Sequence, residues 1–321
     1  MATTGVATRP SPPGGGGPAA GLYSGGPGPI ERGIKVVLFL AALFSVLITV
    51  GILISLLIPN ITFFSNVSLS EFLFGTEWTA AFGEKYSWDK AWGVLPLVVG
   101  TLVATFIALL FAVPLGLGSA VLLSEYASPR VRKTVKPMLE ILAGVPTVVY
   151  GFLALTIITP ILKNFLPIDG IYNQFSAGMV MGFMIVPTVA SLSEDAMSAV
   201  PLGLRQGSYA LGANRMKTTL RVVFPAALSG IVAAIVLGIA RAVGETMILA
   251  IAAGNEAKLT LNPFEGAQTM TGYIAQIASG DAPQGSPVYY SLFAVGALLF
   301  VMTLVINLIS IRLVRRYRQV Y

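Results

Sequence analysis

The sequence predicts an all-α integral membrane protein with six transmembrane helices. Hydrophobic residues make up 55% of its 321 residues and charged residues 11%, whereas soluble domains contain about 25% charged residues. The mean hydropathy of +0.81 agrees with this class. The apolar residues form long runs, and about 20 helical residues are enough to cross a hydrocarbon core of about 30 Å. No segment has the pattern expected of strands.

Two residue types are missing from the sequence, and their absence narrows the possible functions. The chain contains no cysteine and no histidine. Disulfide scaffolds, thiolate or imidazole metal sites, and Cys–His or Ser–His catalytic arrangements are therefore excluded. We predict no catalytic residues and no metal site. A membrane-embedded enzyme is the least favoured class, because the sequence shows no nucleophile–base cluster.

The N-terminal part divides into a polar tail and a first apolar span. Residues 1–29 are rich in Gly and Pro, which predicts a disordered cytoplasmic tail; recruitment of a partner by this tail is the alternative. Residues 30–59 predict the first transmembrane helix, which is uncharged from Val36 through Pro59. This run is too long for the apolar region of a signal peptide, and no cleavage site follows promptly, so we expect the span to be retained.

The remainder predicts an extracytoplasmic segment, a five-helix core and a short basic tail. Residues 60–92 carry three tryptophans, which serve either as an interfacial aromatic belt or as a docking surface. The core covers 93–313, and the basic tail 314–321 is expected to contact anionic headgroups. The core spans are expected at 94–123, 138–163, 177–197, 220–252 and 288–311, with a cytoplasmic loop at 198–219.

Basic residues predict the orientation of these spans. Most of the 20 Lys and Arg residues fall on one side of the membrane if the N-terminus is cytoplasmic. By the positive-inside rule, both termini are therefore predicted to be cytoplasmic. The net charge of +6 then reflects membrane topology, and we expect no nucleic-acid partner. The basic segments are 1–35, 130–136, 205–221 and 312–318.

The cytoplasmic loop contains a short predicted helix. Pro201 is placed to begin it, and Gly212 is placed to end it in a left-handed conformation. Leu204, either Ser208 or Tyr209, and Leu211 then fall on one side at helical spacing. Such an amphipathic helix either rests on lipid headgroups or inserts into a groove of a soluble partner. The pattern alone leaves both interpretations open.

The same loop resembles the coupling motif of ABC-importer permeases, which reads Glu-Ala-Ala, three residues, Gly, nine residues, Ile, any residue, Leu-Pro. Gly212 takes the glycine position, Val222 the isoleucine position and Phe224-Pro225 the Leu-Pro pair. The acidic triplet is replaced by Gln206-Gly207-Ser208, which weakens a charged contact but leaves a docking helix plausible. The resemblance implies that the 201–225 loop contacts an ATPase through Gln206, Gly207, Ser208, Leu211, Gly212, Val222, Phe224 and Pro225.

A wider set of segments narrows this resemblance. "GTEW", "LPLVVGTL", "AVPLGLGSAVLLSEYASPRVRK", "EILAGVPTVVYG", "YALGA" and "ARAVGETM" together resemble the permease subunits of phosphate-specific ABC importers, the C type rather than the A type. The resemblance implies a type I ABC importer permease (MetI-like) architecture in a bacterial plasma (inner) membrane. It also implies an A-type second permease, two ATPase subunits and an extracytoplasmic phosphate-binding protein. No phosphate-binding Gly-rich loop ending in Gly-Lys-Ser/Thr is present, so ATP-Mg is expected on partner subunits and no cofactor on this chain.

Arg241 and Glu245 stand inside the fifth predicted span. An arginine at mid-bilayer costs about 2.5–3.5 kcal/mol on insertion scales, so it faces protein or water. At positions i and i+4 of one helix the two side chains share a face and can pair, either as a structural ion pair or as part of a substrate path. Arginine matches phosphate oxygens well, and the resemblance of "ARAVGETM" implies roles in translocation. Our hypothesis is an exchange, in which Glu245 neutralises Arg241 until phosphate arrives, with Thr246 adding a hydroxyl donor.

Two other functions stay open at this point. The first keeps the permease and changes the cargo to another oxyanion, such as sulfate or molybdate. The second is a secondary transporter or channel that acts alone. Such proteins usually show internal repeats of the span pattern, which this sequence does not show, and they need no coupling loop.

Overall fold

The computed structural model describes residues 29–80 and 87–317. The predicted tail 1–29 and the end of the basic tail 314–321 therefore lie almost wholly outside the described residues. The described part is helical apart from loops and one isolated bridge between Trp78 and Trp92, which confirms the all-α prediction. By their contacts, residues 1–54 and 55–321 form two units, each described by itself.

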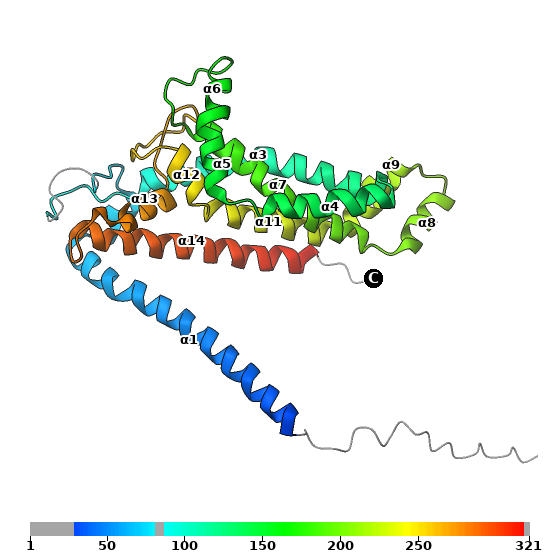
Figure 1. The fold of residues 1–321 in the computed structure, drawn as a ribbon, viewed down its shortest axis with the longest axis horizontal. Coiled ribbons are helices and arrows are strands. Elements are labelled where there is room, and N and C mark those ends of the chain that lie inside the picture. The colour runs from blue at the N-terminus through cyan, green and yellow to red at the C-terminus, as the bar shows by residue number, and fades with distance from the viewer. Residues whose placement is uncertain (1–28, 81–86, 318–321) are drawn as a thin grey trace, which may run out of the picture. The chain divides into compact units, whose positions relative to one another are not determined.

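The elements follow one another along the chain as Figure 1 shows. The helices are α1 (Pro29–Asn66), α2 (Leu69–Phe74), α3 (Leu95–Val121), α4 (Pro129–Ala143), α5 (Thr147–Leu153), α6 (Thr159–Leu162), α7 (Gln174–Ser198), α8 (Leu202–Ala210), α9 (Arg215–Thr218), α10 (Phe224–Ala226), α11 (Leu228–Val243), α12 (Met247–Ala252), α13 (Met270–Gln276) and α14 (Pro287–Tyr317). Short π-helical segments continue some of them: η1 (Leu122–Tyr126), η2 (Ala154–Ile158), η3 (Thr219–Val223) and η4 (Ile277–Asp281).

The first unit contains the N-terminal part of α1. Its apolar side chains are largely exposed, as expected of a helix whose surface meets lipid. Glu31 and Lys35, one helical turn apart, form an ion pair at 2.7 Å. Four helices of the described residues, α1 among them, are long and apolar enough to cross a membrane, and the number rises to six if each of two bent helix pairs is one span.

Two of the predicted spans, 138–163 and 220–252, are bent and broken rather than continuous helices. The first bends by 85° between α4 and α5. Pro146 explains this break, because a proline disfavours helical geometry in the residue before it, here Val145. The second bends by 72° between α10 and α11 and breaks again between Val243 and Met247.

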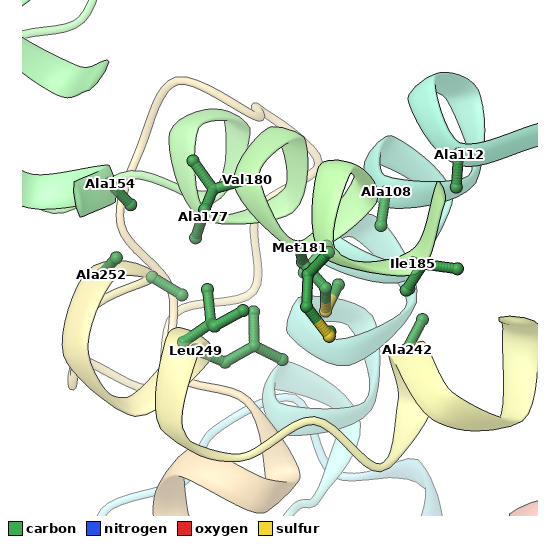
Figure 2. Close-up of a cluster of buried hydrophobic side chains, with 14 of the residues drawn as sticks. Ala108, Ala112, Ala154, Ala177, Val180, Met181, Ile185, Ala242, Leu249 and Ala252 are labelled. Carbon is green, nitrogen blue, oxygen red and sulfur yellow. The ribbon is translucent and has the colours of Figure 1, made fainter. Parts of the chain in front are cut away.

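The middle of the second unit is built on close packing of α3 against α7. Glycines make this possible: a Cβ atom added to Gly182 would lie 2.6 Å from the carbonyl oxygen of Ala108. Small residues at helix contacts let backbones approach in membrane proteins. Figure 2 shows Leu249 of α12 lying near Ala177 and Val180 of α7, in a buried cluster that also includes Ala242 of α11. This cluster includes Ala242, which follows Arg241, and Ile248 and Leu249, which lie shortly after Glu245.

Trp78 and Trp92 are too deeply buried to serve as an exposed belt or a docking surface, the two roles weighed from the sequence. Trp78 is 3% exposed and Trp92 1% exposed, and both belong to a buried cluster. The rings of Trp78 and Trp92 meet edge to face at 5.8 Å, and Trp78 meets Tyr273 at 5.1 Å. Trp88, which is partly buried, stacks on Tyr290 at 6.3 Å. The aromatic side chains after α1 therefore pack together with Tyr273 of α13 and Tyr290 of α14.

Candidate functional site

Arg241 lies in the last turn of α11 and is half-buried. Its Nη1 atom donates to the hydroxyl of Thr188 in α7 at 2.9 Å, and its Nη2 atom donates to the carbonyl of Ala143 at 3.4 Å. Ala143 is the last residue of α4, where helix carbonyls lack partners within the helix and the helix dipole favours a cation. The guanidinium therefore sits at the break between α4 and α5.

Glu245 is buried in a different local structure. Its Oε1 atom accepts hydrogen bonds from the backbone N–H groups of Met247 at 3.1 Å and Ile248 at 3.3 Å. Its carbonyl accepts a hydrogen bond from the Thr271 hydroxyl at 2.7 Å. The carboxylate thus satisfies free N–H groups at the start of α12.

The structure does not support the expected pairing of Arg241 with Glu245 on one helix face. α11 ends at Val243 and Gly244 follows as its C-terminal cap, so the i, i+4 relation of a continuous helix does not exist here. Among the residues that the structure describes, no carboxylate forms an ion pair with Arg241. Glycine favours helix ends, and this signal in "RAVGE" was available in the sequence.

Thr246 lies within the same break and is partly exposed. Its hydroxyl donates to the carbonyl of Gly244 at 3.3 Å. Breaks in spanning helices are tolerated at membrane depth where they are buried in protein or line a water-filled cavity. Arg241 thus bonds at the α4–α5 break, and Thr246 lies in the break between α11 and α12.

The loop helix predicted between Pro201 and Gly212 is present as α8 (Figure 1). Gly212 has φ of 82°, its N–H bonds to the carbonyl of Tyr209 at 2.9 Å, and the N–H of Ala213 bonds to the carbonyl of Ser208 at 3.2 Å. This pair of hydrogen bonds is the Schellman arrangement that glycine favours at a helix end. The prediction of a left-handed stop at Gly212 is confirmed.

The residues predicted to contact an ATPase separate into an exposed and a packed group. Gln206, Gly207 and Gly212 are exposed, and Leu211 is 90% exposed. Ser208 is half-buried and shares a hydrogen bond with the Thr218 hydroxyl at 2.9 Å. Of the distal motif residues, Phe224 packs on a buried cluster at this end of the bundle, Val222 is half-buried in η3, and Pro225 is exposed.

Two buried carboxylates lie at the same end of the bundle, which we call the α8 end. Glu125 of η1 pairs with Arg205 of α8 at 3.0 Å. Glu194 of α7 pairs with Arg132 and with Lys136 of α4, the latter at 2.8 Å. Sequence reasoning missed these pairs. Acidic residues close to the ends of apolar runs were the available signal, but their partners are distant in the chain.

Comparison with known proteins identifies the family to which the chain belongs. Residues 112–319 match the model of the family described as the binding-protein-dependent transport system inner membrane component. The chain belongs to this family. The prediction of a non-enzymatic transport subunit in an inner membrane is thereby confirmed, and a transporter acting alone is not favoured, because members of the family work with a binding protein.

Curated relatives cover most of the permease. It is 35% identical over 271 residues to a probable ABC transporter permease protein YqgH of Bacillus subtilis, covering 84% of this chain and 86% of that one. It is 34% identical over 277 residues to the phosphate transport system permease protein PstC 1 of Mycobacterium tuberculosis, covering 76% and 81%. It is 29% identical over 309 residues to PstC of Haemophilus influenzae, covering 90% and 95%.

Solved structures confirm the fold of the permease. A chain of a bacterial alginate ABC transporter, in complex with an alginate-bound periplasmic protein, superposes with a TM-score of 0.61 at 17% identity, covering 89% of this chain and 95% of that one. A chain of the MetNI methionine ABC transporter in an inward-facing conformation gives a TM-score of 0.58 at 22% identity, covering 70% and 96%. The predicted ABC importer permease architecture is confirmed at the level of the fold.

Proposed function

We propose that this permease is the transmembrane subunit of an ATP-driven inorganic phosphate importer and forms the translocation path with a second, A-type permease. The relatives named as phosphate transport permeases support the substrate class. The single structural observation that carries the proposal is the Arg241 guanidinium, which is half-buried at a helix break and bonded to neutral oxygens.

Within the described part of the chain, neutral acceptors leave the charge of Arg241 uncompensated. A half-buried cation without a carboxylate keeps an electrostatic attraction for an anion, and a guanidinium offers a planar set of donors to phosphate oxygens. The Thr188 hydroxyl and the Ala143 carbonyl hold the side chain in place and are weaker competitors than a carboxylate. Phosphate therefore displaces neutral partners rather than Glu245, which modifies the exchange expected from the sequence.

Glu245 and Thr246 serve the same path in different ways. Glu245 fixes the start of α12 and so holds the break next to Arg241 open. Thr246 presents a partly exposed hydroxyl in that break, which provides a donor for an oxyanion as it leaves Arg241.

Energy reaches this path from partner subunits. In this proposal two ATPase subunits bind ATP-Mg and contact the α8 end through the exposed residues of α8 and its cap, including Gln206 and Leu211. This end then faces the cytoplasm together with both chain termini, as the distribution of basic residues indicates. A phosphate-binding protein delivers its cargo to the opposite side, and this chain needs no cofactor of its own.

The proposal is tested by purifying the tagged permease with its partners and measuring ATP hydrolysis in lipid. We expect the ATPase subunits and a second permease to co-purify, and phosphate-loaded binding protein to stimulate hydrolysis. Sulfate and molybdate serve as matched anions, since another oxyanion is the alternative cargo. Stimulation by one of these and not by phosphate, or purification without any ATPase, would contradict the proposal.

A further inference from the structure

The helix α8 is attached to the rest of the bundle by few contacts. It has no buried residue, and among the described residues two of its polar side chains bond outside the helix and its caps. Arg205 reaches Glu125 and Met197, and Ser208 reaches Thr218. Motion of α8 can therefore be transmitted through these attachments, through its packing against η3 and α9, or through the chain itself.

The Arg205 contact is the stronger of the two. Its Nη2 atom donates to Glu125 Oε1 at 3.0 Å and to the Met197 carbonyl at 2.7 Å. The side chains are 14% and 5% exposed, respectively. Separating them would leave a buried carboxylate without a cation, which is strongly unfavourable. α8 therefore cannot move away from Glu125 without a large penalty.

Glu125 lies at a distinctive position in the fold. It belongs to η1, the π-helical continuation of α3, and Ser124 donates a further hydrogen bond to its Oε1 atom at 3.0 Å. Thr218, the partner of Ser208, directly precedes the π-helical η3. π-helical turns are rare and occur often at functional sites. Glu125 and Thr218, the side-chain partners of Arg205 and Ser208, thus lie in or directly before a π-helical turn.

The Nε atom of Arg205 adds a further detail. It is buried and has no hydrogen-bond partner, so the guanidinium uses one nitrogen for Glu125 and keeps another donor unused. A second donor allows the guanidinium to turn against the carboxylate while the charge contact is retained. The Arg205–Glu125 contact therefore permits rotation of the guanidinium while the two side chains stay paired.

We propose that Arg205 is a positioning residue that transmits displacement of α8 to α3 through Glu125. This inference rests on the proposed function, in which α8 contacts an ATPase. α3 packs along α7, and α7 carries the Thr188 hydroxyl that holds Arg241. A displacement of η1 is therefore transmitted through α3 and α7 to Thr188, which contacts Arg241 in the proposed phosphate site.

A matched ion pair at the same end provides the control. Lys136 of α4 pairs with Glu194 and Asp195 of α7 and does not bond to α8. Lys136→Gln removes a charge contact at this end while Arg132 still compensates Glu194. A general weakening of the α8 end is thereby distinguished from loss of the α8 attachment.

The experiment uses the complete complex in lipid, with phosphate uptake and ATP hydrolysis measured per complex. We expect Glu125→Gln, Arg205→Gln and the double variant each to lower the ratio of phosphate transported to ATP hydrolysed by about fivefold or more, with the ATPase still bound. The double variant should resemble the single ones, because both act on one contact. Lys136→Gln should keep the wild-type ratio.

A distance measurement tests the same attachment without phosphate. The chain has no cysteine, so spin labels at Leu122→Cys in η1 and Leu202→Cys in α8 report their separation; both positions are exposed. We expect one separation with and without nucleotide, and a nucleotide-dependent separation once Arg205→Gln is added. The inference is overturned by a wild-type transport ratio in the variants, by an equal loss in Lys136→Gln, or by label distances insensitive to Arg205→Gln. If phosphate does not stimulate hydrolysis, the proposed function fails while the labels still decide this inference.

Discussion

Two half-buried arginines of this permease differ in their partners: Arg205 at the α8 end and Arg241 at the break between α4 and α5. Arg205 meets a buried carboxylate, whereas Arg241 meets a hydroxyl and a backbone carbonyl. A paired arginine has its charge compensated and resists separation from its partner, which suits a mechanical attachment. An arginine with neutral partners retains attraction for an anion, which suits a substrate path. The charge of the group that the arginine contacts therefore distinguishes the mechanical role of Arg205 from the substrate role of Arg241.

The largest expected effect tests the structural side of this comparison. Glu194→Gln should lower the free energy of unfolding by about 3 kcal/mol, because the change leaves two cations at the α8 end without their buried carboxylate. The measurement is the unfolding midpoint of the purified permease in detergent. Glu140→Gln is the matched control, since Glu140 is exposed and forms no ion pair among the described residues. Equal effects of both changes would contradict this assignment.

Substitutions of Arg241 should reduce phosphate transport more than they reduce the stability of the permease. Arg241→Gln and Arg241→Lys are expected to reduce phosphate uptake by about 10- to 100-fold, since hydrogen bonds to a charged group contribute about 1.5–3 kcal/mol. The unfolding midpoint should fall less than in Glu194→Gln, because the change leaves no buried charge without its counter-ion. Uptake is measured in vesicles in which assembly of the complex has been verified. Normal transport by both variants would remove Arg241 from the substrate path, and poor assembly would make it structural.

A substitution of Gly212 tests whether α8 couples ATP hydrolysis to transport. Gly212→Val should reduce ATP-driven uptake by about 5- to 30-fold, because a residue with a Cβ atom pays about 1–2 kcal/mol in the left-handed conformation at φ of 82°. Membrane insertion should be unaffected. Gly203→Ala is the control, since Gly203 lies within α8 with open space around it and an ordinary φ. Undiminished uptake in Gly212→Val would contradict a coupling role for α8.

The smallest effect is expected from Lys258 and Glu265, an exposed ion pair in the loop before α13. The hydrogen bond from Lys258 lowers the pKa of Glu265, and the same bond raises the pKa of Lys258. The contribution of Glu265 is therefore lost as pH falls through its lowered pKa, and that of Lys258 as pH rises through its raised pKa. Between about pH 5 and pH 10, Lys258→Ala should leave the melting temperature unchanged, because water screens exposed pairs. A clear decrease would show that this loop depends on charge as the α8 end does.

Local signals predicted much of the fold. Apolar runs gave the spans, and Pro201 with Gly212 gave both ends of α8. The pairing of Arg241 with Glu245 was wrong because the i, i+4 rule presumes a continuous helix, and Gly244 ends it. Arg205 and Glu125 could not be paired from sequence, since 80 positions separate them. Whether a charge has a charged partner depends on helix packing, which residue patterns do not encode locally.

The aromatic core after α1 has a consequence for spectroscopy. All 3 tryptophans of the chain belong to or border this core, remote from α8. Ultraviolet emission from the native protein is thus a reporter of this aromatic core and not of the α8 end. A single indole introduced on the surface of α8, in a background where these three tryptophans are replaced, would give the α8 end an optical signal of its own.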